Sequence, residues 1–99
     1  MSGKKTVDSS SQVSRNIVVT NRLGIHARPA SMFVRLANQF KCDIFVEKDG
    51  ETVNGKSIMG LMTLAAGPGS QIRVEARGDD ANRAVDEIES LLDRKFGED

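Results

Sequence analysis

The sequence has no tryptophan or tyrosine, and only one cysteine and one histidine among its 99 residues. Phenylalanine alone offers little for stacking on bases, and a net charge of zero gives no broad attraction for nucleic acid or an anionic membrane. The single Cys42 cannot form an internal disulfide, and we expect it to be a small buried residue in a reducing compartment. Neither a signal peptide nor a membrane-spanning run is visible. We therefore expect a cytoplasmic protein that does not bind nucleic acid or insert into a membrane.

The first 15 residues, MSGKKTVDSSSQVSR, are polar, rich in serine and without apolar periodicity. This composition predicts a disordered amino-terminal extension over residues 1–15. Residues 16–99 then form one domain, which is large enough to fold alone but too small for a deep cofactor pocket. We expect no cofactor.

The rest of the chain predicts an α+β fold with the element order β-α-β-β-α-β-α. Alternating or β-branched runs indicate four strands, two of which flank the hairpin signal Asp49-Gly50. Three helices are expected: one starting near His26 with Pro29 in its first turn, one capped by Ser57, and one capped by Asp79 or Asp80. Such an order favours a four-stranded, largely antiparallel sheet with the three helices on one face. The expected strands cover 16–21, two segments within 42–54, and 70–78.

The only histidine, His26, lies in GIHARPA (24–30), between a glycine turn and a predicted helix start. A helix amino terminus offers unpaired N–H groups and a partial positive charge, and the guanidinium of Arg28 suits phosphate oxygens. We see no partner carboxylate or serine nucleophile for a hydrolytic triad, and one histidine with one distant cysteine is too few ligands for a zinc site. The pattern favours a ring nitrogen that accepts a phosphoryl group over a structural histidine, and it leaves open which nitrogen.

The predicted helix after Ser57 carries more apolar side chains than a short helix can bury. At about 100° per residue, they spread over roughly 220° of its circumference. We expect Leu61 and Leu64, with part of Ile58, to face the core, and Met59 and Met62 to point outward. Pliable exposed methionines suit a surface that meets several partners, although loops covering them are the alternative.

GETVNGKS (50–57) formally matches the P-loop pattern of nucleotide-binding proteins. We reject this interpretation because Asp49-Gly50 indicates a hairpin, which places Thr52 and Val53 in an extended strand. No second strand supplies an aspartate for magnesium, so no metal site is expected. Lys56 remains available for an incoming phosphate or a partner.

LGIHARPA (23–30) together with VNGKSIMGLMTLAAGPGSQI (53–72) resembles the HPr family of phosphocarrier proteins, over roughly residues 16–96. The resemblance implies an open-faced β-sandwich that carries phosphate from Enzyme I to Enzyme IIA components of the sugar phosphotransferase system. It implies phosphorylation of His26 on Nδ1, with Arg28 stabilising the phosphate. The protein would then be a recycled carrier and not an enzyme. The resemblance also implies these partner-docking residues: Ala27, Pro29, Ser31, Ile58, Met59 and Met62.

Ser57 matches a serine that an ATP-dependent kinase phosphorylates in one branch of this family. The resemblance thus adds a serine kinase/phosphorylase and a transcription regulator as partners. A carrier of the nitrogen branch, without sugar transport, is one alternative. A regulator that acts only through phosphorylated Ser57 is another, although family members of that kind lack the active histidine. No extended apolar helix face is left after the core is assigned, so we expect a monomer.

Overall fold

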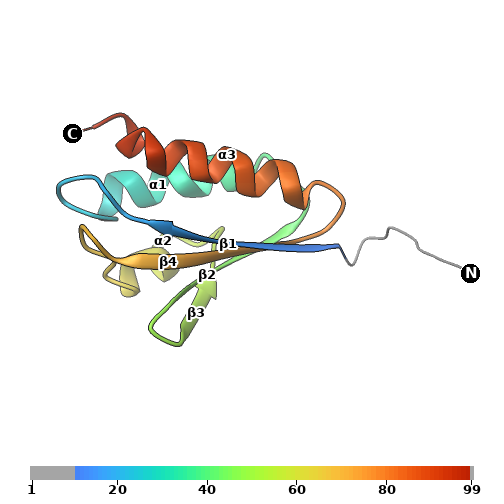
Figure 1. The fold of residues 1–99 in the computed structure, drawn as a ribbon, viewed down its shortest axis with the longest axis horizontal. Helices are drawn as coiled ribbons and strands as arrows, with labels where there is room; N and C mark the ends of the chain where they lie inside the picture. The colour runs from blue at the N-terminus through green and yellow to red at the C-terminus, as the bar shows by residue number, and fades with distance from the viewer. Residues whose placement is uncertain (1–10, 99) are drawn as a thin grey trace, which may run out of the picture.

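The computed structural model describes residues 11–98, which form one four-stranded sheet and its covering helices (Figure 1). All strand pairs are antiparallel, and the strand order is β1-β4-β2-β3. The sequence of elements confirms the predicted α+β order. The elements are β1 (Gln12–Val18), α1 (Ala27–Ala37), β2 (Asp43–Lys48), β3 (Glu51–Asn54), α2 (Ile58–Thr63), β4 (Gln71–Arg77), α3 (Ala81–Asp93) and a 3-10 turn (Lys95–Gly97).

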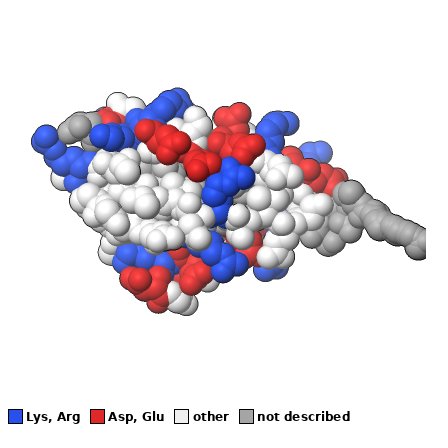
Figure 2. All heavy atoms as spheres, in the orientation of Figure 1, with Lys and Arg blue, Asp and Glu red and all other residues white. Residues whose placement is uncertain are grey.

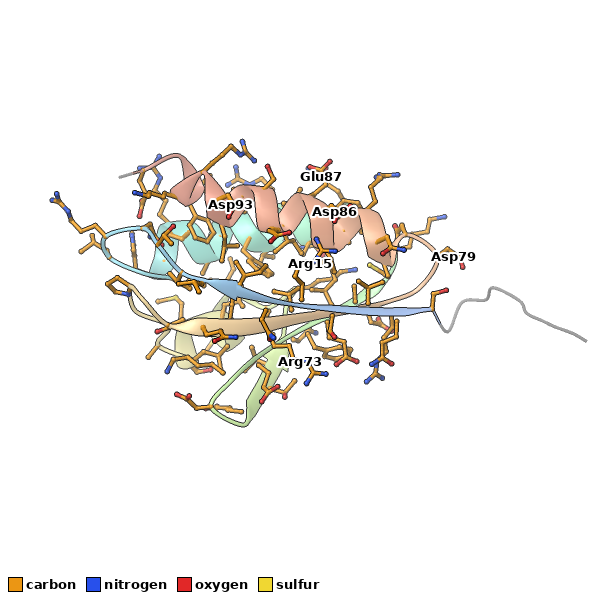
Figure 3. The ribbon with its side chains drawn as sticks, in the orientation of Figure 1. Arg15, Arg73, Asp79, Asp86, Glu87 and Asp93 are labelled. Atoms are coloured by element: carbon orange, nitrogen blue, oxygen red, sulfur yellow. The ribbon has the colours of Figure 1, made fainter. Side chains whose placement is uncertain are left out.

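The first strand starts earlier than the sequence predicts. Residues 12–15, assigned above to the disordered extension, pair with β4 from Gln12 opposite Arg77 to Arg15 opposite Val74. The Arg15 guanidinium also reaches across to α3, 2.6 Å from Asp86 and 2.8 Å from Glu89 (Figure 3). The boundary at residue 15 is therefore wrong, because pairing and ion pairs order a segment too polar to be read as a strand. Residues 1–10 of that predicted extension lie outside the described residues.

The core lies between the sheet and the helices. In Figure 1, α1 and α3 run along the upper side of the sheet and contact each other. Alternate residues of the strands face them, as the pattern in 70–78 predicts: Ile72, Val74 and Ala76 are fully buried. Burying side chains of this kind contributes about 1.5–3 kcal/mol for each large one. The helices contribute Phe33, Ala84, Val85, Ile88 and Leu92 to the same cluster.

The other face of the sheet is polar and holds both signs of charge. Arg73 lies 3.5 Å from Glu47 and 3.4 Å from Glu75, and Arg77 lies 2.8 Å from Glu75. Figure 2 shows basic and acidic side chains interspersed along the borders of the visible surface, with a belt of uncharged residues between them. This mixture agrees with the neutral composition, and this surface offers no broad basic area for a polyanion.

The hairpin between β2 and β3 decides against a P-loop. Asp49 and Gly50 have φ values of 53° and 85°, the left-handed conformations that a two-residue hairpin turn requires. Gly55 then passes close to β2: a Cβ atom there would lie 2.6 Å from Ile44 Cγ2. Lys56, expected to be available for a phosphate, donates its ammonium instead to the Phe40 carbonyl at 2.8 Å. The segment is a strand and a tight turn, not a phosphate-binding loop.

The start of α3 differs in detail from the prediction. Asp80 holds the N-cap position, but its side chain makes no cap hydrogen bond. Its carboxylate accepts hydrogen bonds from the backbone amides of Lys41 and Cys42, at 2.9 and 3.0 Å. Asp80 thus ties the loop after α1 to α3. Burial and the neighbouring Asp80 carboxylate raise the pKa of the Cys42 thiol to about 11, so the buried cysteine stays a neutral thiol.

Candidate functional site

His26 is the N-cap residue of α1, and its side chain is 39% exposed. The turn before it is tightly constrained: Gly24 has φ +70°, and a Cβ atom there would lie 2.4 Å from the Ala66 carbonyl oxygen. Ile25 donates its amide to that same oxygen at 2.9 Å. Only glycine fits both the left-handed backbone and the close approach, and this fixes the position of the following histidine.

The first turn of α1 leaves backbone donors beside the ring. The first intrahelical hydrogen bond runs from the Ala30 amide to the His26 carbonyl, at 2.9 Å. The amides of Ala27 and Arg28 precede it, and Pro29 has no N–H to leave unpaired. Pro29 lies in the first helical turn, as predicted, and Arg28 is exposed. A half-exposed imidazole, two amides and a guanidinium therefore share one helix end, which suits an anionic group.

The structure adds a carboxylate that sequence reasoning missed. Glu98 Oε1 lies 3.3 Å from His26 Nε2, although the two residues are 72 positions apart. The statement that no partner carboxylate accompanies the histidine is therefore wrong. The contact needs the whole length of α3 and the turn after it, so local spacing gives no sign of it. The one sequence feature that could have indicated this contact is Phe96-Gly97. An apolar residue followed by glycine, after the polar residues 93–95, is typical of a turn that packs against the core.

Asn21 holds this carboxylate in place. Its side chain is fully buried, and Nδ2 donates to the Gly24 carbonyl at 2.7 Å and to Glu98 Oε1 at 2.9 Å. The hydrogen bond from Asn21 is the main reason that the pKa of Glu98 is lowered, with further contributions from His26 and from the nearby charge of Arg28. Glu98 is therefore an ionised hydrogen-bond acceptor at neutral pH.

The second predicted motif adjoins the histidine loop. Ser57 Oγ accepts the Gly60 amide at 3.0 Å, which confirms its N-cap role. Leu61 of α2 and the C-cap residue Leu64 are buried, whereas Ile58, Met59 and Met62 are 41%, 77% and 44% exposed. The outward orientation of both methionines is thus confirmed. Because α2 contacts α1, and the residues after α2 bind the turn before His26, the exposed side chains and the histidine belong to one region.

The remaining predicted docking residues differ in exposure. Ala27 is exposed and Ser31 is half-buried, so both have surface that a partner can reach. Pro29 is buried, which leaves little of its surface for a partner.

Two further observations delimit the site. A hollow of about 520 Å³ lies at the opposite end of the molecule, where Asp79 is labelled in Figure 3, and its lining includes Cys42 and Asp80. It holds no histidine, and both side chains have structural contacts, so the hollow is not part of the candidate site around His26. Among residues 11–98, no cluster of three or more His, Cys, Asp or Glu residues could hold a metal ion. In that same part of the chain, no helix has the length and apolarity needed to cross a bilayer.

Comparisons with known proteins agree with this geometry. The family described as the PTS HPr component phosphorylation site matches residues 13–94. The HPr-like protein Crh of Halalkalibacterium halodurans is 43% identical over 83 residues, covering 84% of this chain and 99% of that protein. The phosphocarrier protein HPr of Neisseria meningitidis serogroup A is 43% identical over 86 residues, covering 87% and 97%.

Solved structures show the same fold. An HPr structure from Thermoanaerobacter tengcongensis superimposes with a TM-score of 0.85 at 42% identity, covering 88% of this chain and 98% of that one. An HPr dimer from the same organism gives a TM-score of 0.71 at 45% identity, covering 83% and 94%.

Proposed function

The chain belongs to the HPr family of phosphocarrier proteins of the phosphotransferase system, and we propose that His26 is the residue that carries the phosphoryl group. The observation that carries this proposal is the half-exposed His26 ring at the first turn of α1, beside the exposed Arg28. A carrier must meet a donor and an acceptor in turn, so an open site suits it better than a closed pocket. In this role the protein is a co-substrate that is consumed and regenerated.

The proposed transfer uses a lone pair on a ring nitrogen of His26, which the family resemblance places on Nδ1. This nitrogen attacks the phosphorus of the phosphohistidine on Enzyme I. A new N–P bond forms while the donor's N–P bond breaks, and its electron pair returns to the donor's ring. Arg28 and the first-turn amides bind the phosphoryl oxygens. The reverse sequence then delivers the group to a histidine of an Enzyme IIA domain.

The shallow site also suits the energetics of a carrier. If the protein held the phosphoryl group too tightly, the barrier to the next transfer would rise. Only interactions that are stronger in the transition state than in the bound state accelerate a step. One exposed guanidinium and a helix terminus give modest stabilisation. We propose that the protein acts in the cytoplasm and passes phosphate onward for sugar uptake.

Ser57 is a proposed regulatory site. Its side chain is half-exposed, and its oxygen caps α2 at the edge of the surface formed by Ile58, Met59 and Met62. A phosphate there would add about −1.5 to −2 charges at a helix start, which tolerates them. The added charge would instead weaken docking of partners on this surface. A serine kinase/phosphorylase would control it, and a transcription regulator would bind the modified form.

The similarity to Crh gives reason to test a second candidate function, that of a regulator. Crh of Halalkalibacterium halodurans is as similar to this chain as the Neisseria HPr, at 43% identity in both cases. The candidate is a regulator that acts through Ser57 alone, and a nitrogen-branch carrier is a further alternative. His26 and Arg28 are both present in this chain, which favours phosphoryl transfer with regulation added to it.

The test is phosphorylation with Enzyme I and phosphoenolpyruvate. We expect one phosphate per chain, labile in acid and stable in alkali, which is lost in His26→Ala but retained in Ser57→Ala. If the folded wild-type protein forms no such adduct, the carrier function is wrong. A phosphate formed only with ATP and a serine kinase, and lost in Ser57→Ala, would then identify the regulator.

A further inference from the structure

We propose that Glu98, held by Asn21, is a positioning residue that keeps the proton of His26 on Nε2 and so leaves Nδ1 as the nucleophile. The inference rests on the proposed function, in that it assigns a role within phosphoryl transfer to His26. Neither Asn21 nor Glu98 lies in the two sequence motifs, and what is new is the role assigned to this pair.

The contact between the ring and the carboxylate selects one tautomer. Glu98 Oε1 faces His26 Nε2 at 3.3 Å. An ionised carboxylate can only accept hydrogen bonds, whereas a neutral imidazole has one donor and one acceptor nitrogen. If Nε2 held the lone pair, two acceptors would face each other. The stable arrangement has N–H at Nε2, and the lone pair is then on Nδ1.

Asn21 makes the position of the carboxylate specific. Its amide group has two hydrogens, and Nδ2 donates to both the Gly24 carbonyl and Glu98 Oε1. Gly24 belongs to the turn that places His26, and its carbonyl also accepts the His26 amide at 3.1 Å. The same side chain therefore fixes the backbone that holds the ring and the carboxylate that faces it.

Asn21 is the one fully buried polar residue in the described chain, and its Oδ1 has no hydrogen-bond partner among residues 11–98. An unpaired buried oxygen is unfavourable for folding, so packing alone does not explain an asparagine at this position. The two hydrogen bonds that its side chain donates explain the asparagine.

The turn after α3 positions Glu98. Phe96 is 1% exposed and belongs to the core, which anchors the turn after α3. Lys95, Phe96 and Gly97 all have positive φ, at 55°, 56° and 73°, and the Glu98 amide donates to the Lys95 carbonyl at 2.9 Å. Glu98 is 20% exposed. The carboxylate is thus part of the folded domain and not a freely moving terminal side chain.

In this arrangement the ring proton stays on Nε2 throughout the transfer. When Nδ1 attacks phosphorus, the ring gives up a lone pair and keeps the proton on Nε2, so the phosphorylated ring becomes a cation. No proton has to leave in that step. The Glu98 carboxylate already faces Nε2–H and stabilises the positive charge that develops there. On transfer to the next protein, the N–P bond breaks, its electron pair returns to Nδ1, and the ring is neutral again.

The test uses ¹⁵N NMR of the ring in unphosphorylated protein, at a pH where the imidazole is neutral. His26 is the only histidine, so both ring ¹⁵N signals come from one residue, and their couplings to the ring protons distinguish Nδ1 from Nε2. We expect the wild-type protein to populate the Nε2–H form almost exclusively. Glu98→Ala should shift the population toward the mixture of an unconstrained imidazole and should slow phosphorylation by Enzyme I severalfold. Glu87→Ala is the matched control, since Glu87 is exposed on the outer side of α3 (Figure 3).

An unchanged tautomer population in Glu98→Ala, with the variant folded by circular dichroism, overturns the positioning role. Glu98→Gln provides a second check: it keeps an acceptor oxygen, so it should retain the tautomer better than alanine while losing the charge. The NMR readout does not require phosphorylation. Failure of the positioning role is therefore distinguishable from failure of the carrier function, which would appear as a wild-type protein that Enzyme I does not phosphorylate.

Discussion

The His26 ring has a cationic and an anionic neighbour, and we propose different roles for the two in the same transfer. Arg28 is exposed at the helix terminus, where an incoming phosphoryl group can reach it. Glu98 faces Nε2, the nitrogen away from the proposed reaction. In this proposal Arg28 binds the phosphoryl group, and Glu98 stabilises the positive charge that the ring acquires.

Substitutions of Arg28 should show how much of its effect on the phosphorylation rate comes from its charge and how much from the shape of the guanidinium. Lysine keeps the charge but loses the planar fork that matches two phosphate oxygens, so the rate of phosphorylation should fall in the order wild type, Arg28→Lys, Arg28→Ala. Because Arg28 is exposed, stability should change by no more than about 0.5 kcal/mol. Rapid-quench phosphorylation with urea unfolding measures both. Equal rates for the lysine and alanine variants would contradict a bidentate role.

The lowered pKa of Glu98 predicts a dependence of stability on pH. Its pKa in the folded protein lies below the usual 4.5, so its contribution is present above pH 4.5 and is lost as pH falls through the folded value. Wild type should therefore be more stable than Glu98→Gln at neutral pH, and the difference should shrink in acid. Urea unfolding at both conditions checks this. A difference that is constant with pH would mean that the ionised carboxylate is not responsible.

At the scale of elements, α2 has one face in the core and an exposed face that we propose as a docking surface. Leu61 is 1% exposed, and Met59, two residues earlier and on the other side of the helix, is 77% exposed. Leu61→Ala should destabilise the protein by about 2–5 kcal/mol because it leaves a cavity in the core. Met59→Ala should leave stability nearly unchanged and raise the KM with which Enzyme I uses the protein. The pair serve as controls for each other: a Met59 variant that unfolds as easily as the Leu61 variant would contradict a docking face.

Asp80 connects the start of α3 to the loop after α1, and its removal should lower the stability of the fold. Its carboxylate accepts two backbone hydrogen bonds from Lys41 and Cys42. Asp80→Ala would leave both amides without this partner, and a hydrogen bond to a charged group contributes a net of about 1.5–3 kcal/mol. Water can replace the partner of the exposed Lys41 amide, which reduces the loss. We expect a loss of about 1–3 kcal/mol in thermal unfolding, with the phosphorylation rate of the folded protein unchanged. A slower phosphorylation at full occupancy of the native state would show that this loop also affects the distant site.

Elements with a clear pattern were predictable from the sequence. The alternation in 70–78 and the Asp49-Gly50 turn specify β4 and the β2–β3 hairpin without reference to the rest of the chain. The start of β1 was not predictable in this way. Its residues Ser14 and Arg15 are polar because one side faces solvent and the other meets acidic residues of α3. That information belongs to the assembled fold.

At the scale of the whole molecule, the two motifs of the site were predictable, but its completion was not. His26 and Arg28 are recognised by their spacing at a helix start, and Ser57 by its cap position. Asn21 and Glu98 are 77 residues apart in the sequence, and they meet only because α3 packs on the sheet. Local sequence patterns therefore identify the proposed nucleophile, His26, and miss the carboxylate that faces it.

The assembly state is also a property of the whole molecule. Large exposed hydrophobic side chains in the described chain are Val18, Leu23, Ile58, Met59 and Met62. Three of them belong to the proposed docking surface, and we expect partners and not a second copy to cover it. Sedimentation equilibrium should give the mass of one chain, 10.8 kDa. A stable mass of twice that value would contradict the monomer.

The most direct test of the phosphocarrier role is to locate the phosphorus atom. Ring-¹⁵N-labelled protein would be phosphorylated by Enzyme I and phosphoenolpyruvate and examined by ³¹P–¹⁵N correlation. We expect a single N–P coupling, assigned to Nδ1 of His26, with Nε2 still protonated. Phosphate found on Ser57, or on Nε2, would contradict the site as assembled from His26, Arg28 and Glu98.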